Sequence, residues 1–487
     1  GTGTGRGRER EREREEPQLL SSCVSRTGLA AMGASQSSDS ERAYEECIKL
    51  NFRRYGLDSS AEIPPIKVVV AVNNLAFNLL AEMASSRDAD GDLIAPAQGL
   101  GALYTAVAGA TTLVEEGPKR GGSATLQLTP AALQFNDAIL LPLAFEAGLE
   151  AFARVLTSAA GEPPGKSTFM QANCLWVSKA IHREYAEFAK AMLGLEVKGM
   201  TTSAEKINEW GAGRSFQRLT GLVGALNFRE VDRGALFGTN VTVFDGVWDV
   251  AFDEAQTKLD HFVGKGGIHY SCMMMRRRER RMKYMEVWGG DPESTPERPG
   301  IVVENPTNLS VAVTSGMSCQ VVEVPFDGGE LVADIILPAA NVACGEVVAS
   351  LAREAGRLSR WVAALRFKDV ELRLPRFESE CNTGDLRKAL AEVGVSDAFA
   401  GDAPFKRASA EPLWLYGITA KSALAIREDG GKPAPKEEAN KDKMITAALS
   451  AVATNVHCNR PFIFVIRHRF GYILQACIIQ KPTFPGV

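Results

Sequence analysis

The segment "NVTVFDGVWDVAFDEAQTKLDHF", which runs from Asn240 to Phe262, joins a strand-like run to aromatic residues at fixed intervals. A tryptophan such as Trp248 contributes a large apolar area where a sheet meets its covering segment, so we expect it to be buried. We expect Asn240 to hydrogen-bond buried backbone beneath that sheet, because buried amides need partners. Each residue alone would fit the core of any α+β protein. The segment therefore has to be interpreted together with its surroundings.

Helical and strand-like patterns separate along the chain. Early segments repeat apolar residues at helical spacing, whereas late segments alternate with period two or are continuously apolar. The helical sets are Val72, Leu75, Leu79 and Met83, and Phe145, Leu149, Phe152 and Leu156. The strand-like runs are "VELRLPRF", "FIFVI" and "YILQACII". Helices early and strands late predict an α+β fold.

The bulk composition limits the possible partners. A chain of 487 residues with 45% hydrophobic content can bury a large core. Its net charge of −4 argues against a general nucleic-acid binder, which would need a basic excess. The longest weakly polar run, Gly99 to Val114, is shorter than the roughly 20 residues of a membrane span. We expect a buried helix there and no membrane span.

The N-terminal segment predicts disorder. Residues 1–40 include "GRGREREREREE", which has almost nothing to bury, so we expect one folded domain over 41–487. The sequence as given lacks a basic start followed by an apolar stretch, which favours a cytoplasmic location. An extracellular location stays open if the natural N-terminus differs. Nine scattered cysteines without a CxxC pair predict mostly reduced thiols.

Two catalytic interpretations fail. The "AGEPPGKS" segment at residues 160–167 resembles a phosphate loop, but Pro163 and Pro164 remove backbone donors that such a loop needs. We expect an ordinary loop at Lys166. The chain has no G-x-S-x-G motif that could supply a nucleophile to one of its five histidines. The histidines are also not spaced as metal ligands. These patterns predict a protein that is not an enzyme and that uses no cofactor or metal.

A basic cluster, "MMMRRRERRMK", covers Met273 to Lys283. Such a cluster could bind a polyanion. Glu279 interrupts it, and no aromatic residues are interleaved as they would be in a single-strand nucleic-acid site. We therefore expect a solvated loop.

Further patterns occur in one order along the chain. They include "FNLLAEMASSRDADGDLIAPAQGLGALYTAVAGATT", "INEW", the Asn240 segment, "VVEVPFDGGELVADIILP", "LRLPRFE" and "RPFIFVIRH". Together they resemble the serpin family of serine protease inhibitors over almost all of residues 70–485. The matching residues are Phe77, Pro96, Gly109, Ala110, Thr112, Asn240, Phe244, Gly246, Trp248, Phe252, Thr257, Phe262, Pro325, Pro338, Pro375, Phe377, Leu386, Gly394, Phe399, Pro461, Phe462, Phe464, Arg467 and Pro482.

The resemblance implies a fold and a mechanism. The expected fold has three β-sheets, eight to nine helices and an exposed reactive-centre loop. In this family the loop is offered to a protease as a substrate. After cleavage it inserts into the large sheet as a new strand, and the protease stays attached as an acyl-enzyme.

The resemblance also locates the loop, at about residues 430–458. Gly430 aligns with the hinge glycine, and Glu428 precedes it as in the family. Spacing from the hinge places the scissile bond at Met444-Ile445, whereas counting back from Pro461 places it at Ser450-Ala451. Met444 implies a chymotrypsin- or elastase-like serine protease as partner, with a cysteine protease as an alternative, and we expect a monomer.

Several residues depart from the family pattern. The hinge continues through Gly431, Pro433, Pro435 and Glu437, although prolines cannot donate ladder hydrogen bonds and a buried carboxylate is costly. In the sheet-opening region, which also contains Asn240 and Trp248, the family's two serines correspond to Ala95 and Gln98 and its histidine to Ala420. These changes keep a second hypothesis open, a non-inhibitory serpin that acts as a binding or scaffold protein.

Overall fold

The computed structural model describes most of the chain from residue 66 onward. The ranges are 66–85, 91–111, 165–200, 203–226, 234–288, 317–354, 356–400, 405–433 and 453–483, with short pieces between 113 and 138. The expected disorder of residues 1–40 and the domain start at residue 41 lie outside these ranges and stay predictions. No helix in the described ranges is both long and apolar enough to span a membrane.

Seven α-helices lie in the described residues. They are α2 (Ile66–Ser85), α3 (Ala97–Thr111), α6 (Arg183–Leu193), α7 (Ala204–Arg214), α10 (Cys344–Arg353), α11 (Arg357–Ala364) and α12 (Arg387–Glu392). The apolar periodicity from Val72 correctly predicted α2, and the buried helix expected after Gly99 is α3, in which every residue is buried. The predicted helix around Phe145 lies outside the described residues.

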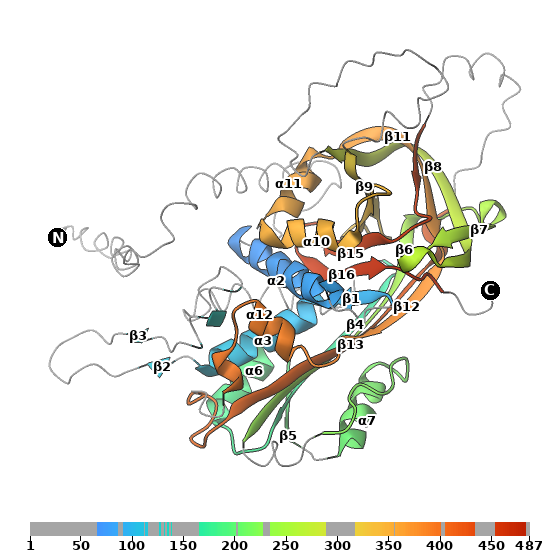
Figure 1. The fold of residues 1–487 in the computed structure, drawn as a ribbon. Helices are drawn as coiled ribbons and strands as arrows, with labels where there is room; N and C mark the ends of the chain where they lie inside the picture. The colour runs from blue at the N-terminus through green and yellow to red at the C-terminus, as the bar shows by residue number, and fades with distance from the viewer. Residues whose placement is uncertain are drawn as a thin grey trace, which may run out of the picture.

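A five-stranded sheet occupies the lower part of Figure 1. Its strand order is β12 (Phe377–Asn382), β13 (Trp414–Lys432), β6 (Ala235–Val250), β4 (Thr168–Val177) and β5 (Glu196–Gly199). Helix α3 packs against β4, β6 and β13 on one face, and α7 contacts β6 on the other (Figure 1). Both faces are therefore covered, which explains the mostly apolar β6 and β13.

The second sheet has nine strands. Along its main path they are β1 (Leu93–Ala95), β16 (Ile473–Ile479), β15 (Phe462–His468), β10 (Leu331–Pro338), β9 (Met317–Pro325), β8 (His269–Trp288), β11 (Arg366–Pro375) and β14 (Thr454–His457). The ninth, β7 (Lys258–Val263), pairs with β8. A third, two-stranded sheet joins β2 (Leu113–Val114) to β3 (Leu126–Gln127). The α+β class and the expected three sheets are thus confirmed.

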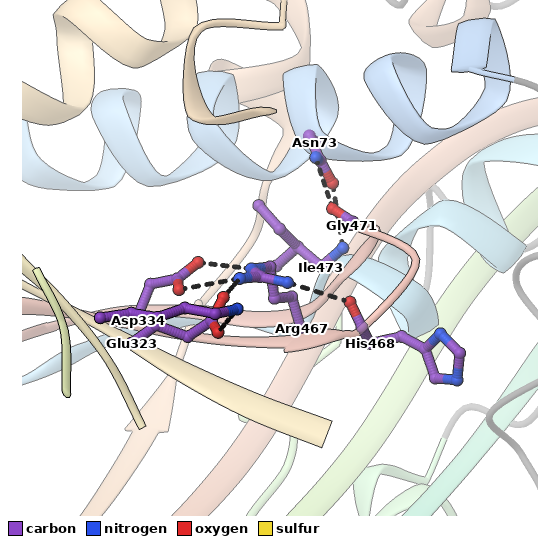
Figure 2. A network of polar contacts seen from close by, with 8 residues as sticks. Asn73, Glu323, Asp334, Arg467, His468, Gly471 and Ile473 are labelled. Atoms are coloured by element: carbon purple, nitrogen blue, oxygen red, sulfur yellow. Dashed lines mark hydrogen bonds and ion pairs between the residues drawn. The ribbon is translucent and has the colours of Figure 1, made fainter. Parts of the chain in front are cut away.

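Helix α2 is fixed to the nine-stranded sheet by one side chain. Figure 2 shows that the Asn73 amide donates to the carbonyl oxygen of Gly471 at 2.9 Å. Its Oδ1 accepts from the backbone N–H of Ile473 at 2.9 Å. Gly471 lies in the turn between β15 and β16, and Ile473 begins β16, so the buried amide is satisfied by backbone groups at this turn.

A group of four buried charges crosses the middle of the same sheet. Arg467 of β15 donates to both Asp334 oxygens of β10, at 2.6 and 3.1 Å, and also to Glu323 of β9 (Figure 2). Lys283 of β8 donates to the same Glu323. Burial opposes ionisation of Glu323, but Arg467 and Lys283 outweigh it and lower its pKa, whereas burial raises the pKa of Asp334. The two positive and two negative groups compensate one another, as buried charges must.

The basic cluster was predicted wrongly as a solvated loop, because residues 273–283 lie within strand β8. Its arginines alternate between the two faces. Arg277 is buried and donates to the Val250 carbonyl at 2.6 Å, while Arg278 pairs with Asp369 of β11. Neighbouring strands supply the anions, so a run of like charges is accommodated in a sheet.

The seven cysteines in the described residues are buried free thiols, in line with the expected reduced state. Burial raises the pKa of each one. Buried thiols with raised pKa are poor nucleophiles. Cys23 and Cys47 lie outside the described residues.

The four buried charges of the nine-stranded sheet should contribute strongly to stability. Arg467→Ala should lower the free energy of unfolding by about 3–5 kcal/mol, because two carboxylates would remain buried with one ammonium. Urea denaturation measures the change. Arg183→Ala is the control, since Arg183 pairs with Glu187 on the surface of α6 and should change stability little. Equal losses for the two variants would contradict the importance of the buried group.

Candidate functional site

The candidate site is built on the parallel pair of β6 and β13. Their register runs from Trp414 opposite Ala235 to Lys432 opposite Val250. The two strands are hydrogen-bonded directly to each other, so no further strand lies between them. Strand β13 ends at Lys432, immediately before the segment in which the reactive loop is expected.

Residues at both ends of the expected loop belong to β-strands in the structure. Gly430 and Gly431 still belong to β13, and residues 454–457 form β14, although the loop was expected over about 430–458. Pro433 is exposed and follows the last strand residue. Pro435, Glu437, Met444 and Ile445 lie outside the described residues, so the scissile bond stays a prediction.

Trp248 joins the two large sheets at the end of this strand pair. Its indole is fully buried and stacks on Phe326, with ring centroids 4.7 Å apart and planes at 12°. Its ring lies 6.5 Å from Phe464 of β15, and its Nε1 donates to the Arg427 carbonyl of β13 at 2.8 Å. The expected burial of Trp248 is therefore observed, and its N–H also holds β13 against β6.

The two hinge glycines differ in the space around them. A Cβ on Gly430 would collide with the backbone of Ala251, whereas one on Gly431 would collide with the carboxylate of Asp327, the end of a flexible side chain. The carbonyl of Lys432 accepts from the Ala251 N–H at 2.9 Å. Gly430 therefore needs glycine for lack of space, whereas a side chain at Gly431 would require only that the Asp327 carboxylate move.

Glu428 lies in the irregular part of β13, where the register shifts between Ile426 and Gly430. It is buried, and its nearest cation is Arg376, 3.7 Å away. Lys432 reaches across to Asp249 of β6 at 2.8 Å. Besides backbone hydrogen bonds, the end of the strand pair is thus held by one tryptophan N–H and one surface ion pair.

Asn240 lies in the middle of β6 and is fully buried. Its amide donates to Asn173 Oδ1 at 2.9 Å and to the Ala172 carbonyl at 3.3 Å, both on β4. Its Oδ1 accepts from Thr242 at 3.0 Å. Gly99 of α3 makes room for it, because a Cβ there would collide with the amide. The expected hydrogen bond to buried backbone is present, and it ties β6 to β4.

The residue opposite Asn240 on β13 is Ala420, which is also buried. Its methyl group offers no hydrogen bond, and its backbone N–H instead donates to the Thr383 hydroxyl at 2.9 Å. Among the described residues, side-chain hydrogen bonds cross from β6 to β13 at Trp248 and Lys432 alone. Ala95, the last residue of β1, and Gln98, in the first turn of α3, are both buried, and no hydrogen bond joins either to Asn240. The middle of the strand pair is consequently held by backbone and packing.

The rejected phosphate loop has a structural role. The backbone N–H of Lys166 donates to Asp327 at 3.0 Å, and the Ser167 hydroxyl exchanges hydrogen bonds with the backbone of Val247. Groups that a nucleotide phosphate would need are therefore already engaged. No group of three potential metal ligands occurs within the described ranges.

The sequence analysis missed Asn173, Asp327 and Thr383. Asn173 could have been found, because it interrupts the otherwise apolar run "ANCLWV". Asp327 lies in the "DGG" turn after Phe326, and only the fold brings it near Gly431. Thr383 gives no distinctive sequence signal.

Comparison with known proteins agrees with this geometry. Human Serpin B3 is 25% identical over 270 residues, covering 54% of this chain, and the match spans 60% of its length, less than two thirds. Human Serpin I2 is 23% identical over 319 residues, covering 64% of this chain and 70% of that protein. Uncleaved ovalbumin superposes with a TM-score of 0.64 at 18% identity, covering 85% of this chain and all of that one.

Two further solved structures share the fold. Human thyroxine-binding globulin has a TM-score of 0.64 at 16% identity and covers 86% of this chain, with all of its own chain matched. Serpin48 of the insect Tenebrio molitor has a TM-score of 0.62 at 18% identity and covers 87% of this chain, again with all of its own chain matched. The family profile described as serpin, or serine protease inhibitor, matches residues 70–477, most of the sequence. The chain therefore belongs to the serpin family.

Proposed function

We propose that this protein is a monomeric suicide-substrate inhibitor of serine proteases, with chymotrypsin- or elastase-like enzymes as its targets. The observation that carries the proposal is the directly paired β6 and β13, with the expected loop leaving from the end of β13. The protease serine attacks the carbonyl carbon of the scissile bond, which breaks, and an ester joins the enzyme to the loop. The new amino terminus leaves with the β14 side of the chain.

The strand arrangement supports a driving force for insertion. A loop that turns back after Lys432 and enters between β6 and β13 would run antiparallel to both strands. One parallel ladder would then be replaced by two antiparallel ladders, and antiparallel pairing is slightly more stable per residue. The inserted residues would gain hydrogen bonds that a surface loop lacks.

A second function, binding or scaffolding without inhibition, is favoured by one observation. Pro433 directly follows the last strand residue and would be among the first residues to enter the sheet. A proline removes a ladder donor and is found essentially at sheet edges. The side chains that would face inward are those of Gly431, Pro433, Pro435, Glu437, Ala439 and Lys441. Two prolines and two charges in this set oppose insertion.

Incubation with chymotrypsin, elastase, trypsin and subtilisin tests the first function. Inhibition predicts a denaturant-resistant complex at the summed mass, since the acyl-enzyme ester survives on a denaturing gel. We expect it with chymotrypsin or elastase if Met444-Ile445 is the bait. Cleavage between Pro433 and Ala453 without any complex would support the binding function instead.

Replacement of Lys432 to Glu438 by an alanine-rich sequence tests whether the hinge limits insertion. After loop cleavage the variant should melt at a higher temperature than the cleaved wild type, because small side chains fit a sheet interior that prolines and charges oppose. Differential scanning calorimetry of both cleaved proteins measures the shift, with the uncleaved proteins as controls. Identical melting of the two cleaved forms would assign the limitation to the altered residues Ala95, Gln98 and Ala420.

The hydrogen bond between Asn240 and Asn173 predicts that the two side chains contribute jointly to the stability of the protein. Asn173→Ala should destabilise the protein by about 1–3 kcal/mol, because the buried Asn240 amide loses the closer of its two acceptors. With Asn240→Ala the two losses should be non-additive by about 0.5 kcal/mol or more in a double-mutant cycle. Asn455→Ala, at an exposed position of β14, is the control and should be additive with either change. Additive losses for Asn173 and Asn240 would show that the amides are not coupled.

A further inference from the structure

A cavity of about 830 Å³ lies at one edge of the nine-stranded sheet, away from the β6–β13 pair. Strands β10, β15, β16 and β1 all begin or end at this edge, because Ile336 pairs with Ile463, Phe462 with Ile479, and Leu93 with Ile478. The first residues of α10 and the turn after β7 close the other sides. The volume falls in the range of small-molecule sites.

The wall of the cavity is mostly apolar and includes two positively charged side chains. Its carbon surface comes from residues such as Leu93, Val263, Pro338, Val342, Pro461 and Ile478. Two cations, Lys265 and Arg460, also line it, and none of the lining residues, all of which are described, is Asp or Glu. An apolar body with a negative head would match both parts of this wall.

Arg460 is the strongest indication of a ligand. Its guanidinium is half-buried, and Nε and Nη2 donate to the Pro338 carbonyl at 3.0 and 2.8 Å. Its Nη1 makes a long contact of 3.5 Å to Asn459 Oδ1. All of these acceptors are neutral, and within the described part of the chain no carboxylate forms an ion pair with it. Burial lowers the pKa of Arg460, the effect of desolvating a cation without a counterion.

Helix α10 adds to the positive character of the cavity. Its N-terminus contributes Ala343, Cys344 and Gly345 to the wall, and Ala343 provides no side-chain cap. The positive end of a helix favours anions. Glu346, in the first turn, is exposed and does not line the cavity. The Cys344 thiol is buried, and its raised pKa keeps it neutral.

We propose that this cavity binds a small amphiphilic carboxylate, with the acid group at Arg460 and Lys265 and the apolar body along the ends of β10, β15 and β16. The Pro338 carbonyl occupies the Nε–Nη2 side of the Arg460 guanidinium, so a carboxylate would pair with the remaining N–H groups of Nη1 and Nη2. Binding would neutralise a half-buried charge and cover apolar wall. The site is separate from the reactive loop, so the proposal does not depend on protease inhibition.

Decanoate and decanol are the probes, measured by isothermal titration on the full chain. They share a tail and differ in charge. We expect saturable 1:1 binding of decanoate with a Kd below about 100 µM and weaker binding of decanol by about tenfold. Absence of saturation, or equal affinity for the two, would overturn the proposal.

Three variants locate the site. Arg460→Gln keeps a donor for Pro338 but removes the charge, and it should weaken decanoate about ten- to hundredfold while leaving decanol unchanged. Ala340→Trp, at an exposed lining position, should block both probes by filling the cavity. Arg183→Gln on α6 removes a surface charge elsewhere and should leave both affinities unchanged.

A second charge variant keeps the proposal testable if the first variant does not fold. If Arg460→Gln does not fold, Lys265→Gln replaces it, because Lys265 is exposed in the turn and should lower decanoate affinity without affecting the core. Decanoate affinity that is unchanged in both Ala340→Trp and the charge variant would place binding elsewhere and overturn the assignment.

Discussion

The parallel ladder between β6 and β13 is the constraint on which the rest of the structure depends. It runs from Trp414 to Lys432 and is covered on one face by α3 and on the other by α7. A parallel pair in the middle of a sheet is fully buried, so its separation must be compensated by another strand. In this protein the candidate strand is connected directly to the end of β13. The ladder therefore holds the present fold together and is also the place at which the proposed insertion would occur.

Polar contacts divide the five-stranded sheet along this ladder. Asn240 and Asn173 join β6 to β4, whereas the backbone of Ala420 is bonded to Thr383 at the β12 side. Each half is therefore tied to its own outer strand. Between the halves, Trp248 fixes the end nearest the loop, where it also contacts the second sheet through Phe326 and Phe464. With Ala420 opposite Asn240, the middle of the ladder resists opening through backbone bonds and packing.

Much of this architecture could be predicted from local sequence. The spacing from Asn240 to Phe262 and the apolar runs of β15 and β16 indicated the fold. The periodicity of apolar residues along the chain predicts secondary structure and which residues are buried. The contacts of the site could not be predicted in the same way. Asp327 and Gly431 are far apart in sequence, and only the crossing of the two sheets brings them together. The arginine-rich strand β8 was mistaken for a loop because its anions lie on β11 and β9, and a charge run reveals nothing about its neighbours.

The glycines at the end of β13 and the prolines that follow them affect the proposed insertion of the loop differently. Gly430 fits into a space where a side chain would collide with the backbone of Ala251, and Gly431 lies against the carboxylate of Asp327. Pro433, two residues after Gly431, has no backbone N–H and cannot donate a hydrogen bond to either neighbouring strand. Antiparallel insertion would add acceptors and donors from two strands, but each proline leaves one of these unpaired in a sheet interior. The proposed insertion would therefore meet its main resistance at the first residues to enter, of which Lys432 and Pro433 are exposed at the end of β13.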